Sequence, residues 1–310
     1  MRRIAPAILT LAAGLALLAG CGGGSAAESR EEGSVTGRLP VVATTTQLTD
    51  FARAVGGDHV DVYGILKPNV DAHDFEPSPA DIAELARAKV IIKNGVGLED
   101  WFDPVIRNAG AKAPVVEAAT GVAVRRGEGR SDGAGDPHIW QDPRNAKVMV
   151  HNIALALVAA DPGHRADYEA NEAAYAAELD RLDREIATEI GALANKKIVT
   201  NHDAFHYYVD RYGLDFVGSI IPSFDSQAEL SAQDISRIVG VIKSAGVNAV
   251  FSENSLPPKT AEAIARDAGV RVVAGEDALY GDSLGPPGTD GDTYLKMLRH
   301  NTRVIVENLG

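Results

Sequence analysis

The segment from Asp161 to Ala194 constrains the fold of this chain most strongly. Asp161 and Pro162 match a helix start, with a capping carboxylate followed by proline at the first helical position. Apolar residues then recur every three or four positions, which places them on one helical face. At about 1.5 Å per residue this helix is roughly 50 Å long, more than the width of a compact lobe. The apolar positions are Tyr168, Tyr175, Leu179, Leu182, Ile186, Ile190 and Leu193.

The segments on both sides of this predicted helix alternate between strands and helices. Such alternation predicts mostly parallel sheets. We therefore expect an α/β fold of two lobes, each a mostly parallel sheet flanked by helices, joined by one long connecting helix. The alternative for the long segment alone is a bundle helix or a coiled-coil partner. The expected strands are 41–46, 60–66, 89–94 and 113–118 before the helix, and 197–200, 216–221, 249–252 and 271–274 after it. The expected boundaries are an N-terminal lobe at 40–160, the helix at 161–195 and a C-terminal lobe at 196–310.

The first residues match a secretory signal. Two arginines precede an apolar run that is too short for a comfortable transmembrane helix, and Leu18-Ala19-Gly20-Cys21 follows it. Cys21 is the only cysteine, so a disulfide within the chain is excluded. The four residues Leu18 to Cys21 resemble the lipobox of bacterial lipoproteins, and this resemblance implies that residues 1–20 are a signal peptide and that Cys21 carries a lipid anchor. Residues 21–39 are rich in glycine and charge, which is typical of a flexible tether.

Composition excludes one class of partner. The formal net charge is -13, and no basic stripe is present in the sequence. Nucleic-acid-binding domains usually carry a basic patch, so we expect no nucleic acid as a ligand. The glycine-rich segment Gly121–Gly135 contains no histidine and is predicted to be a mobile surface loop.

Histidines and one aspartate occur where the predicted strands end. His73 and His138 precede the long helix, whereas His202 and Asp282 follow it. Ligands of parallel sheets collect at the carboxyl ends of strands, so these side chains are candidates for one site. Three imidazoles and a carboxylate suit Zn²⁺ and are tolerable for Mn²⁺. A lone loop histidine is more often simply solvated, and no closely spaced histidine pair supports the site by spacing alone.

Several other residues are candidates for supporting roles. Glu253 is expected to be a supporting acid in the cleft, with a plain surface position as the alternative. Asp142, like Asp74 and Asp203, follows a histidine closely enough to orient its ring, as outer-shell carboxylates usually do. His206 lies one helical turn after His202 and is expected to support the site or to be exposed. The remaining histidines, expected to be structural or solvated, are His59, His151, His164 and His300.

Together these segments resemble the solute-binding lipoproteins of zinc or manganese ABC importers, in which a rigid helix joins two lobes. The likeness rests on the motif ending at Cys21 and on four further segments. The resemblance implies that His73, His138, His202 and Asp282 ligate the metal. Manganese-selective members tend to carry glutamate where this chain has His202, so the resemblance favours zinc. The four segments are His73 to Ser78, Pro137 to Pro143, His202 to Tyr208 and Gly281 to Leu284.

We therefore expect a non-enzymatic monomer that captures Zn²⁺, or less readily Mn²⁺, and passes it to a membrane ABC permease. Its expected location is the outer face of the cytoplasmic membrane, where Cys21 anchors it. The alternatives are a secreted zinc hydrolase, a binding protein for a metal chelate, and a surface adhesin with a role in cell adhesion. Because imidazoles bind metal only when deprotonated, the expected affinity falls as the pH drops through about 6.5.

Overall fold

The computed structural model describes residues 37–126 and 134–310, which all belong to one compact unit. The predicted signal peptide, Cys21 and most of the predicted tether lie outside the described residues. Residues 127–133 of the predicted surface loop lie outside them as well. Among the described helices, none combines the length and the apolar character that a membrane span requires.

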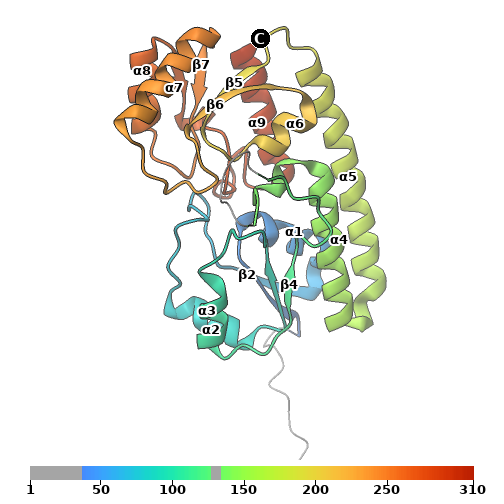
Figure 1. Ribbon diagram of the computed structural model, residues 1–310. Helices are drawn as coiled ribbons and strands as arrows, with labels where there is room; N and C mark the ends of the chain where they lie inside the picture. The colour runs from blue at the N-terminus through green and yellow to red at the C-terminus, as the bar shows by residue number, and fades with distance from the viewer. Residues whose placement is uncertain (1–36, 127–133) are drawn as a thin grey trace, which may run out of the picture. The chain divides into compact units, whose positions relative to one another are not determined.

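A four-stranded parallel sheet forms the first half of the unit, as predicted (Figure 1). Its strand order is β2-β1-β3-β4, so β1 lies inside the sheet and pairs with β2 on one side and with β3 on the other. β3 is buried at three of its four residues, because helices cover both faces of a parallel sheet. The elements are β1 (Leu39–Ala43), α1 (Thr46–Gly56), β2 (Val60–Gly64), α2 (Pro79–Arg87), β3 (Val90–Lys93), α3 (Phe102–Ala109) and β4 (Val115–Glu117).

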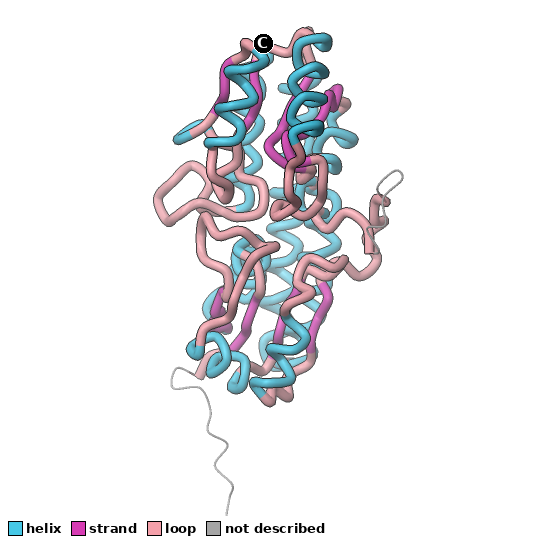
Figure 2. Tube along the Cα trace, turned by 60° about the vertical axis from the view of Figure 1, so that its left-hand side comes forward, coloured by secondary structure: helices cyan, strands magenta, loops and turns pink. Residues whose placement is uncertain are grey.

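The second half contains two short parallel pairs, β5-β6 and β7-β8, with β5 adjacent to β7. Figure 2 shows loops gathered between the strands of the first half and those of the second. The carboxyl ends of the strands lead into these loops. The elements are β5 (Lys197–His202), α6 (His206–Tyr212), β6 (Asp215–Ile221), α7 (Ala232–Ala245), β7 (Ala249–Phe251), α8 (Lys259–Ala268), β8 (Arg271–Val273) and α9 (Tyr294–Leu309).

The long helix begins three residues later than its sequence indicates. α4 (Pro143–Ala160) is followed by a 3-10 turn, η3 (Pro162–His164), and then by α5 (Arg165–Gly191). Pro162 therefore opens the 3-10 turn instead of the α-helix. The Asp161 carboxylate is not used as a cap, because it accepts hydrogen bonds from His164 Nδ1 at 2.6 Å and the Tyr168 hydroxyl at 2.8 Å. Most of the predicted apolar face is buried, namely Tyr168, Leu179, Leu182, Ile186 and Ile190.

α5 packs against elements of both halves. It contacts α1 and α4 from the first half and α6 and α9 from the second. The largest apolar core is continuous through these helices and includes residues from β1 to the end of α9. The two halves therefore share one core along α5. Each half also has a smaller apolar cluster of its own, which includes Ile91 and Phe102 in the first half and Ile238 and Ile264 in the second.

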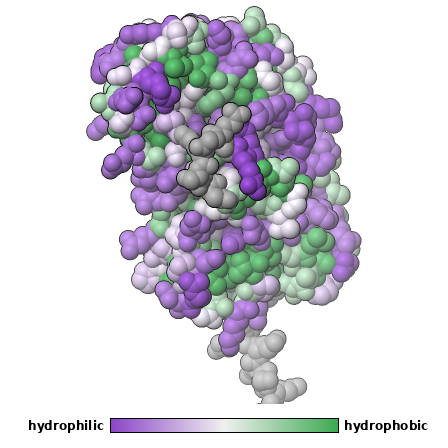
Figure 3. Space-filling model, in the orientation of Figure 1, coloured by the Kyte–Doolittle hydropathy of each residue, from purple (hydrophilic) through white to green (hydrophobic). Residues whose placement is uncertain are grey.

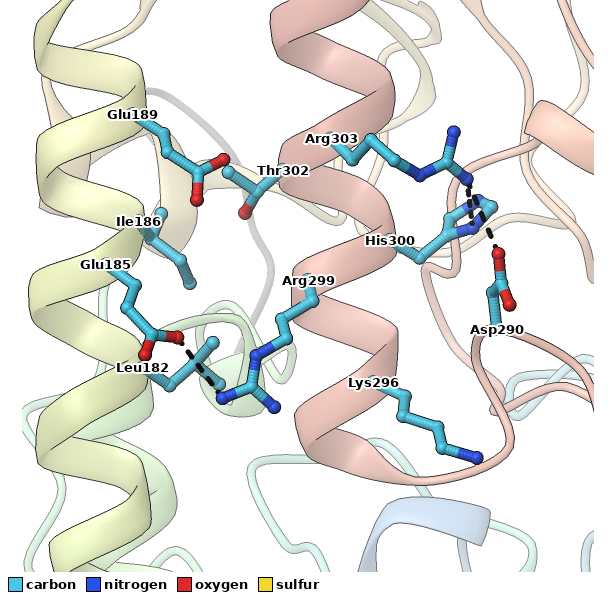
Figure 4. A pocket seen from close by; sticks show the side chains of 10 residues that line it. All are labelled: Leu182, Glu185, Ile186, Glu189, Asp290, Lys296, Arg299, His300, Thr302 and Arg303. Carbon is cyan, nitrogen blue, oxygen red and sulfur yellow. Dashed lines mark hydrogen bonds and ion pairs between the residues drawn. The ribbon is translucent and has the colours of Figure 1, made fainter.

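A cavity of about 490 Å³ lies between α5 and α9, and Figure 4 shows its lining. Arg299 of α9 pairs with Glu185 of α5 at 3.2 Å, and Arg303 lies 3.7 Å from Asp290. These charges neutralise one another, and exposed pairs of this kind stabilise a fold by only about 0–1 kcal/mol. The cavity contains none of the residues that the sequence proposed as ligands.

The surface in Figure 3 is mostly hydrophilic, with apolar residues gathered over the area of β4 and α4. Val115 and Leu155 are the large hydrophobic residues exposed in the described part of the chain, at 41% and 54%. Both residues line one hollow between β4 and α4. A few exposed apolar side chains are normal on a protein surface.

Candidate metal centre

Four side chains that lie far apart in the sequence converge between the two halves. His138 Nε2 lies 3.2 Å from His73 Nε2 and 3.4 Å from His202 Nε2. The carboxylate of Asp282 lies 3.3 Å from His138, 3.4 Å from His202 and 3.6 Å from His73. One ligand atom from each residue fits within 4.8 Å of all the others. These spacings suit a single metal ion bound by three nitrogens and one oxygen.

The strands place these side chains at their carboxyl ends. His73 lies in the loop between β2 and α2, and His202 is the last residue of β5. Asp282 follows β8, and His138 immediately precedes the 3-10 turn η2 (Ile139–Gln141). A side-chain amide secures the His138 segment, because Asn94 after β3 donates to the Pro137 carbonyl at 3.0 Å.

Two buried carboxylates orient two of the imidazoles. His138 Nδ1 lies 2.7 Å from Asp136 Oδ1, and His202 Nδ1 lies 2.8 Å from Glu253 Oε1. The nitrogen that faces the carboxylate carries the proton, so Nε2 of each ring is the nitrogen that faces the centre. This carboxylate–histidine arrangement raises the basicity of a metal ligand and fixes its tautomer.

The structure corrects two of the supporting roles. Asp142 was predicted to orient a histidine, but its carboxylate caps α4 through the Arg144 amide at 2.8 Å and pairs with the Arg144 guanidinium. Asp136, which the sequence analysis missed, orients His138 instead. Asp203 likewise contacts Ser219 and His206, and Glu253 rather than Asp203 orients His202.

His206 lies outside the four-residue group. Its side chain is buried, with its ring 4.5 Å from the ring of Phe216 and its Nε2 3.8 Å from the Asp203 carboxylate. The Phe224 ring makes edge contacts with both imidazoles, with its centroid 6.1 Å from that of His206 and 6.4 Å from that of His138. His206 therefore packs behind the centre.

Asp282 carries the clearest signature of a cation site. It is 1% exposed, and neither of its carboxylate oxygens has a hydrogen-bond partner. A buried carboxylate without a hydrogen-bond donor is costly unless a cation lies against it. Burial alone raises the pKa of Asp282, but the charges of the neighbouring histidines outweigh it and hold the pKa well below the usual value. The carboxylate is therefore ionised and ready to ligate.

The three histidines differ in their protonation. Burial tends to lower the pKa of His138, but the carboxylates of Asp136 and Asp282 outweigh it and raise the pKa to about 9. Burial is likewise outweighed at His202, where Glu253 and Asp282 raise the pKa well above its ordinary value. At His73 burial is the dominant effect and lowers the pKa. Without metal, protons therefore occupy part of the site near neutral pH.

Both halves of the unit hold the loop that carries Asp282. The Gly281 carbonyl accepts hydrogen bonds from the Trp140 indole and the Gln141 amide, each at 3.0 Å. From the first half, the Thr46 hydroxyl accepts from the Leu284 amide at 2.8 Å. From the second half, Asn301 bonds both backbone groups of Tyr280. The backbone on both sides of Asp282 is therefore held by hydrogen bonds, and this keeps the Asp282 carboxylate next to His138.

His73 marks the route into the centre. Its side chain is 9% exposed, whereas the side chains of the other three residues are fully buried. A cavity of about 180 Å³ opens beside it, lined by residues that include Val96, Pro137 and Phe224. Val96 has a φ of 57°, a conformation that is uncommon for a β-branched residue. An ion from solvent would meet His73 first.

We predict that Gly281→Ala weakens metal binding by roughly 10–100-fold, the usual cost of disturbing an outer-shell partner. A Cβ at Gly281 would overlap the Glu253 carboxylate, which orients His202. Gly240→Ala is the matched control, because a Cβ there meets nothing within 4 Å in the middle of α7. Calorimetric titration of both variants checks the prediction, and equal affinities would contradict it.

The fold and the centre define a class of protein: an α/β unit that can hold a metal ion between strand ends from its two halves. Comparison with known proteins places the chain more narrowly. A family model described as the periplasmic component A of the zinc-uptake complex matches residues 41–308, and the chain belongs to this family.

Individual relatives agree on the class and differ in the metal they name. The iron ABC transporter substrate-binding lipoprotein MtsA of Streptococcus pyogenes is 32% identical over 281 residues, 88% of this chain and 89% of the relative. The manganese ABC transporter substrate-binding lipoprotein PsaA of Streptococcus pneumoniae is 29% identical over 321 residues, covering 100% and 99%. The structure of the periplasmic zinc-binding protein TroA of Treponema pallidum matches with a TM-score of 0.81 and 26% identity, covering 88% of this chain and 100% of that one.

The family membership confirms the resemblance and the two-lobed α/β class expected from the sequence. The family is one of metal-binding components of ABC importers. The exact lobe boundaries, the lipid on Cys21 and the monomeric state remain predictions, and nothing favours the adhesin alternative.

Proposed function

We propose that this protein captures Zn²⁺, and Mn²⁺ less readily, outside the cytoplasmic membrane and delivers it to an ABC permease. The convergence of three imidazoles on the buried Asp282 carboxylate carries this proposal. Three nitrogen ligands favour a borderline ion such as Zn²⁺, whereas Mn²⁺ is better suited by oxygen ligands. Relatives named as lipoproteins support an anchor on Cys21 and a place on the outer face of the membrane.

Binding without catalysis fits the number of ligands. Catalytic zinc sites keep an open position for water beside three protein ligands, whereas four protein ligands complete a tetrahedral shell. His73, His138, His202 and Asp282 supply these four ligands. We therefore propose that the protein is not an enzyme, and a chelation-sensitive hydrolase activity in the purified protein would contradict this.

The preference for zinc is tested by competition on metal-stripped protein. We expect one tight equivalent of Zn²⁺ that excess Mn²⁺ does not displace. His202→Glu exchanges one nitrogen ligand for an oxygen ligand, so the ratio of the zinc affinity to the manganese affinity should fall. His151→Ala is the control, because His151 is an exposed residue on α4 that pairs with Glu172. An unchanged ratio in His202→Glu, or tighter manganese binding in the native chain, would overturn the assignment.

A further inference from the structure

A hydrogen-bonded contact, which we call the clasp, joins the two halves beside His73. Oδ2 of Asp71 accepts from the Ser226 hydroxyl at 2.6 Å and from the Gln227 side-chain amide at 2.9 Å. Asp71 lies in the loop between β2 and α2, whereas Ser226 and Gln227 lie in the loop between β6 and α7. Ser226 is 5% exposed, so its hydroxyl is enclosed in this contact. The clasp therefore lies next to the most exposed of the four ligand side chains.

The other oxygen of Asp71 holds His73 itself. Oδ1 of Asp71 accepts from the His73 backbone amide at 2.9 Å. One carboxylate thus bonds both the backbone of a ligand and the opposite half of the unit, and hydrogen bonds to an ionised carboxylate are stronger than those between neutral groups. The position of His73 is therefore coupled to the position of the loop between β6 and α7.

That loop also reaches the other side of the metal centre. The Ser223 carbonyl accepts from the Asp203 amide at 3.2 Å, directly after His202. The Phe224 ring makes an edge contact with the His138 ring, with 6.4 Å between the centroids. The loop is therefore fixed beside His202, lies against His138 and continues into the clasp.

We propose that Asp71 is a positioning residue that slows the release of Zn²⁺, because the clasp must break before His73 can move away from the ion. This inference rests on the proposed function, in which His73 ligates the transported ion. The cavity beside His73 is lined by Phe224 and Asp225 of the same loop, so breaking the clasp also widens the way out. Differences in affinity between closely related complexes usually arise from the rate of dissociation.

The test measures the rates of zinc binding and zinc release in the full chain. Release is followed as transfer of Zn²⁺ to a chromophoric chelator, at concentrations where the rate no longer depends on the chelator. Asp71→Ala should release Zn²⁺ roughly 10–100-fold faster than the native chain, the usual cost of losing an outer partner of a ligand. The association rate constant should change far less.

Substitutions in the opposite half test the contact itself. The Ser226→Ala, Gln227→Ala double variant should also release Zn²⁺ faster than the native chain, although it keeps Asp71 and its bond to the His73 amide. Adding Asp71→Ala to this variant should give the release rate of Asp71→Ala alone, because residues that make one contact are not additive. Additive effects on the release rate would contradict the clasp.

Glu76→Ala is the matched control, because Glu76 is an exposed acid in the same loop, three residues after His73. It removes the same charge and should keep the native release rate. A role of Asp71 in folding alone would lower the unfolding temperature of metal-free Asp71→Ala and leave its zinc release at the native rate. That result, or equal acceleration in Glu76→Ala, would overturn the clasp while tight zinc binding by the native chain leaves the proposed function intact. A native chain that binds no zinc would overturn both.

Discussion

His202→Ala should abolish tight metal binding, with a loss larger than the roughly 10–100-fold that an outer-shell change costs. His202 supplies one of the four ligand atoms and is fully buried at the end of β5. The substitution also removes the imidazole that pairs with the buried Glu253 carboxylate. Calorimetry on metal-stripped protein measures the loss directly.

The same substitution should remove the stabilisation that the metal gives to the fold. An ion that binds only the folded state adds about 2.7 kcal/mol when its free concentration is 100 times Kd. For the native chain we therefore expect zinc to raise the unfolding temperature by several degrees, and for His202→Ala we expect no such rise. Trp140 provides a second readout, because its indole lies 5.3 Å from the His138 ring.

His206→Ala is the control for the loss of a buried imidazole next to the site. His206 packs on Phe216 behind the centre and is not one of the four converging residues. The His206→Ala variant should bind zinc nearly as tightly as the native chain, although we expect it to unfold at a lower temperature. If His206→Ala loses zinc binding while His202→Ala keeps it, the ligand set is wrong.

Local patterns in the sequence predicted most of the fold. The spacing of Leu179, Leu182, Ile186 and Ile190 identified the buried face of α5, because helical periodicity is a local property. The start of α5 was less predictable. Asp161 looks like a cap in the sequence, but a tertiary contact with Tyr168 occupies its carboxylate.

The start of α7 has a capping signal that can be recognised in the sequence. Ser231 and Asp234 form a capping box at the start of α7, and each side chain bonds the backbone amide of the other. The spacing of a serine and an acid three residues apart before an apolar run is readable without a structure.

The metal centre depends on contacts that no local pattern encodes. Strand ends suggested that His73, His202 and Asp282 could share a site, but only the packing of the two halves brings them within bonding reach of one ion. The carboxylate that orients His138 could not be predicted from the sequence either. Asp136 lies two residues before His138 and Asp142 four residues after it, and the choice depends on α4, whose first turn occupies the Asp142 carboxylate.

Metal affinity should depend steeply on pH, and the transition should lie higher than the value of about 6.5 expected from free imidazole. Asp136 and Asp282 outweigh the effect of burial and raise the pKa of His138 to about 9, so near neutral pH the ion must displace a proton. Each displaced proton lowers the affinity about tenfold per pH unit below that pKa. We expect zinc affinity to fall continuously from about pH 9 to pH 6, and we expect zinc binding at neutral pH to release protons.

The stability of the metal-free fold should change with pH in the opposite direction. The pKa of His138 is raised from 6.5 in the unfolded chain to about 9 in the folded one. Its contribution, on the order of 3 kcal/mol, is therefore fully present below about pH 6.5 and is lost as the pH rises through 9. Denaturant unfolding of the metal-free protein across this range checks the sign. A metal-free protein that becomes more stable between pH 7 and pH 9 would contradict the protonation of His138.

Asp136→Asn separates the two effects in one variant. The amide can still accept a hydrogen bond from His138 Nδ1, but the charge that holds the second proton on the ring is removed. The pKa of His138 should therefore fall, so zinc affinity should change less between pH 6 and pH 9 and fewer protons should be released on binding. Calorimetry in two buffers with different enthalpies of ionisation counts these protons. The same count in Asp136→Asn and in the native chain would show that the proton displaced by the metal does not belong to His138.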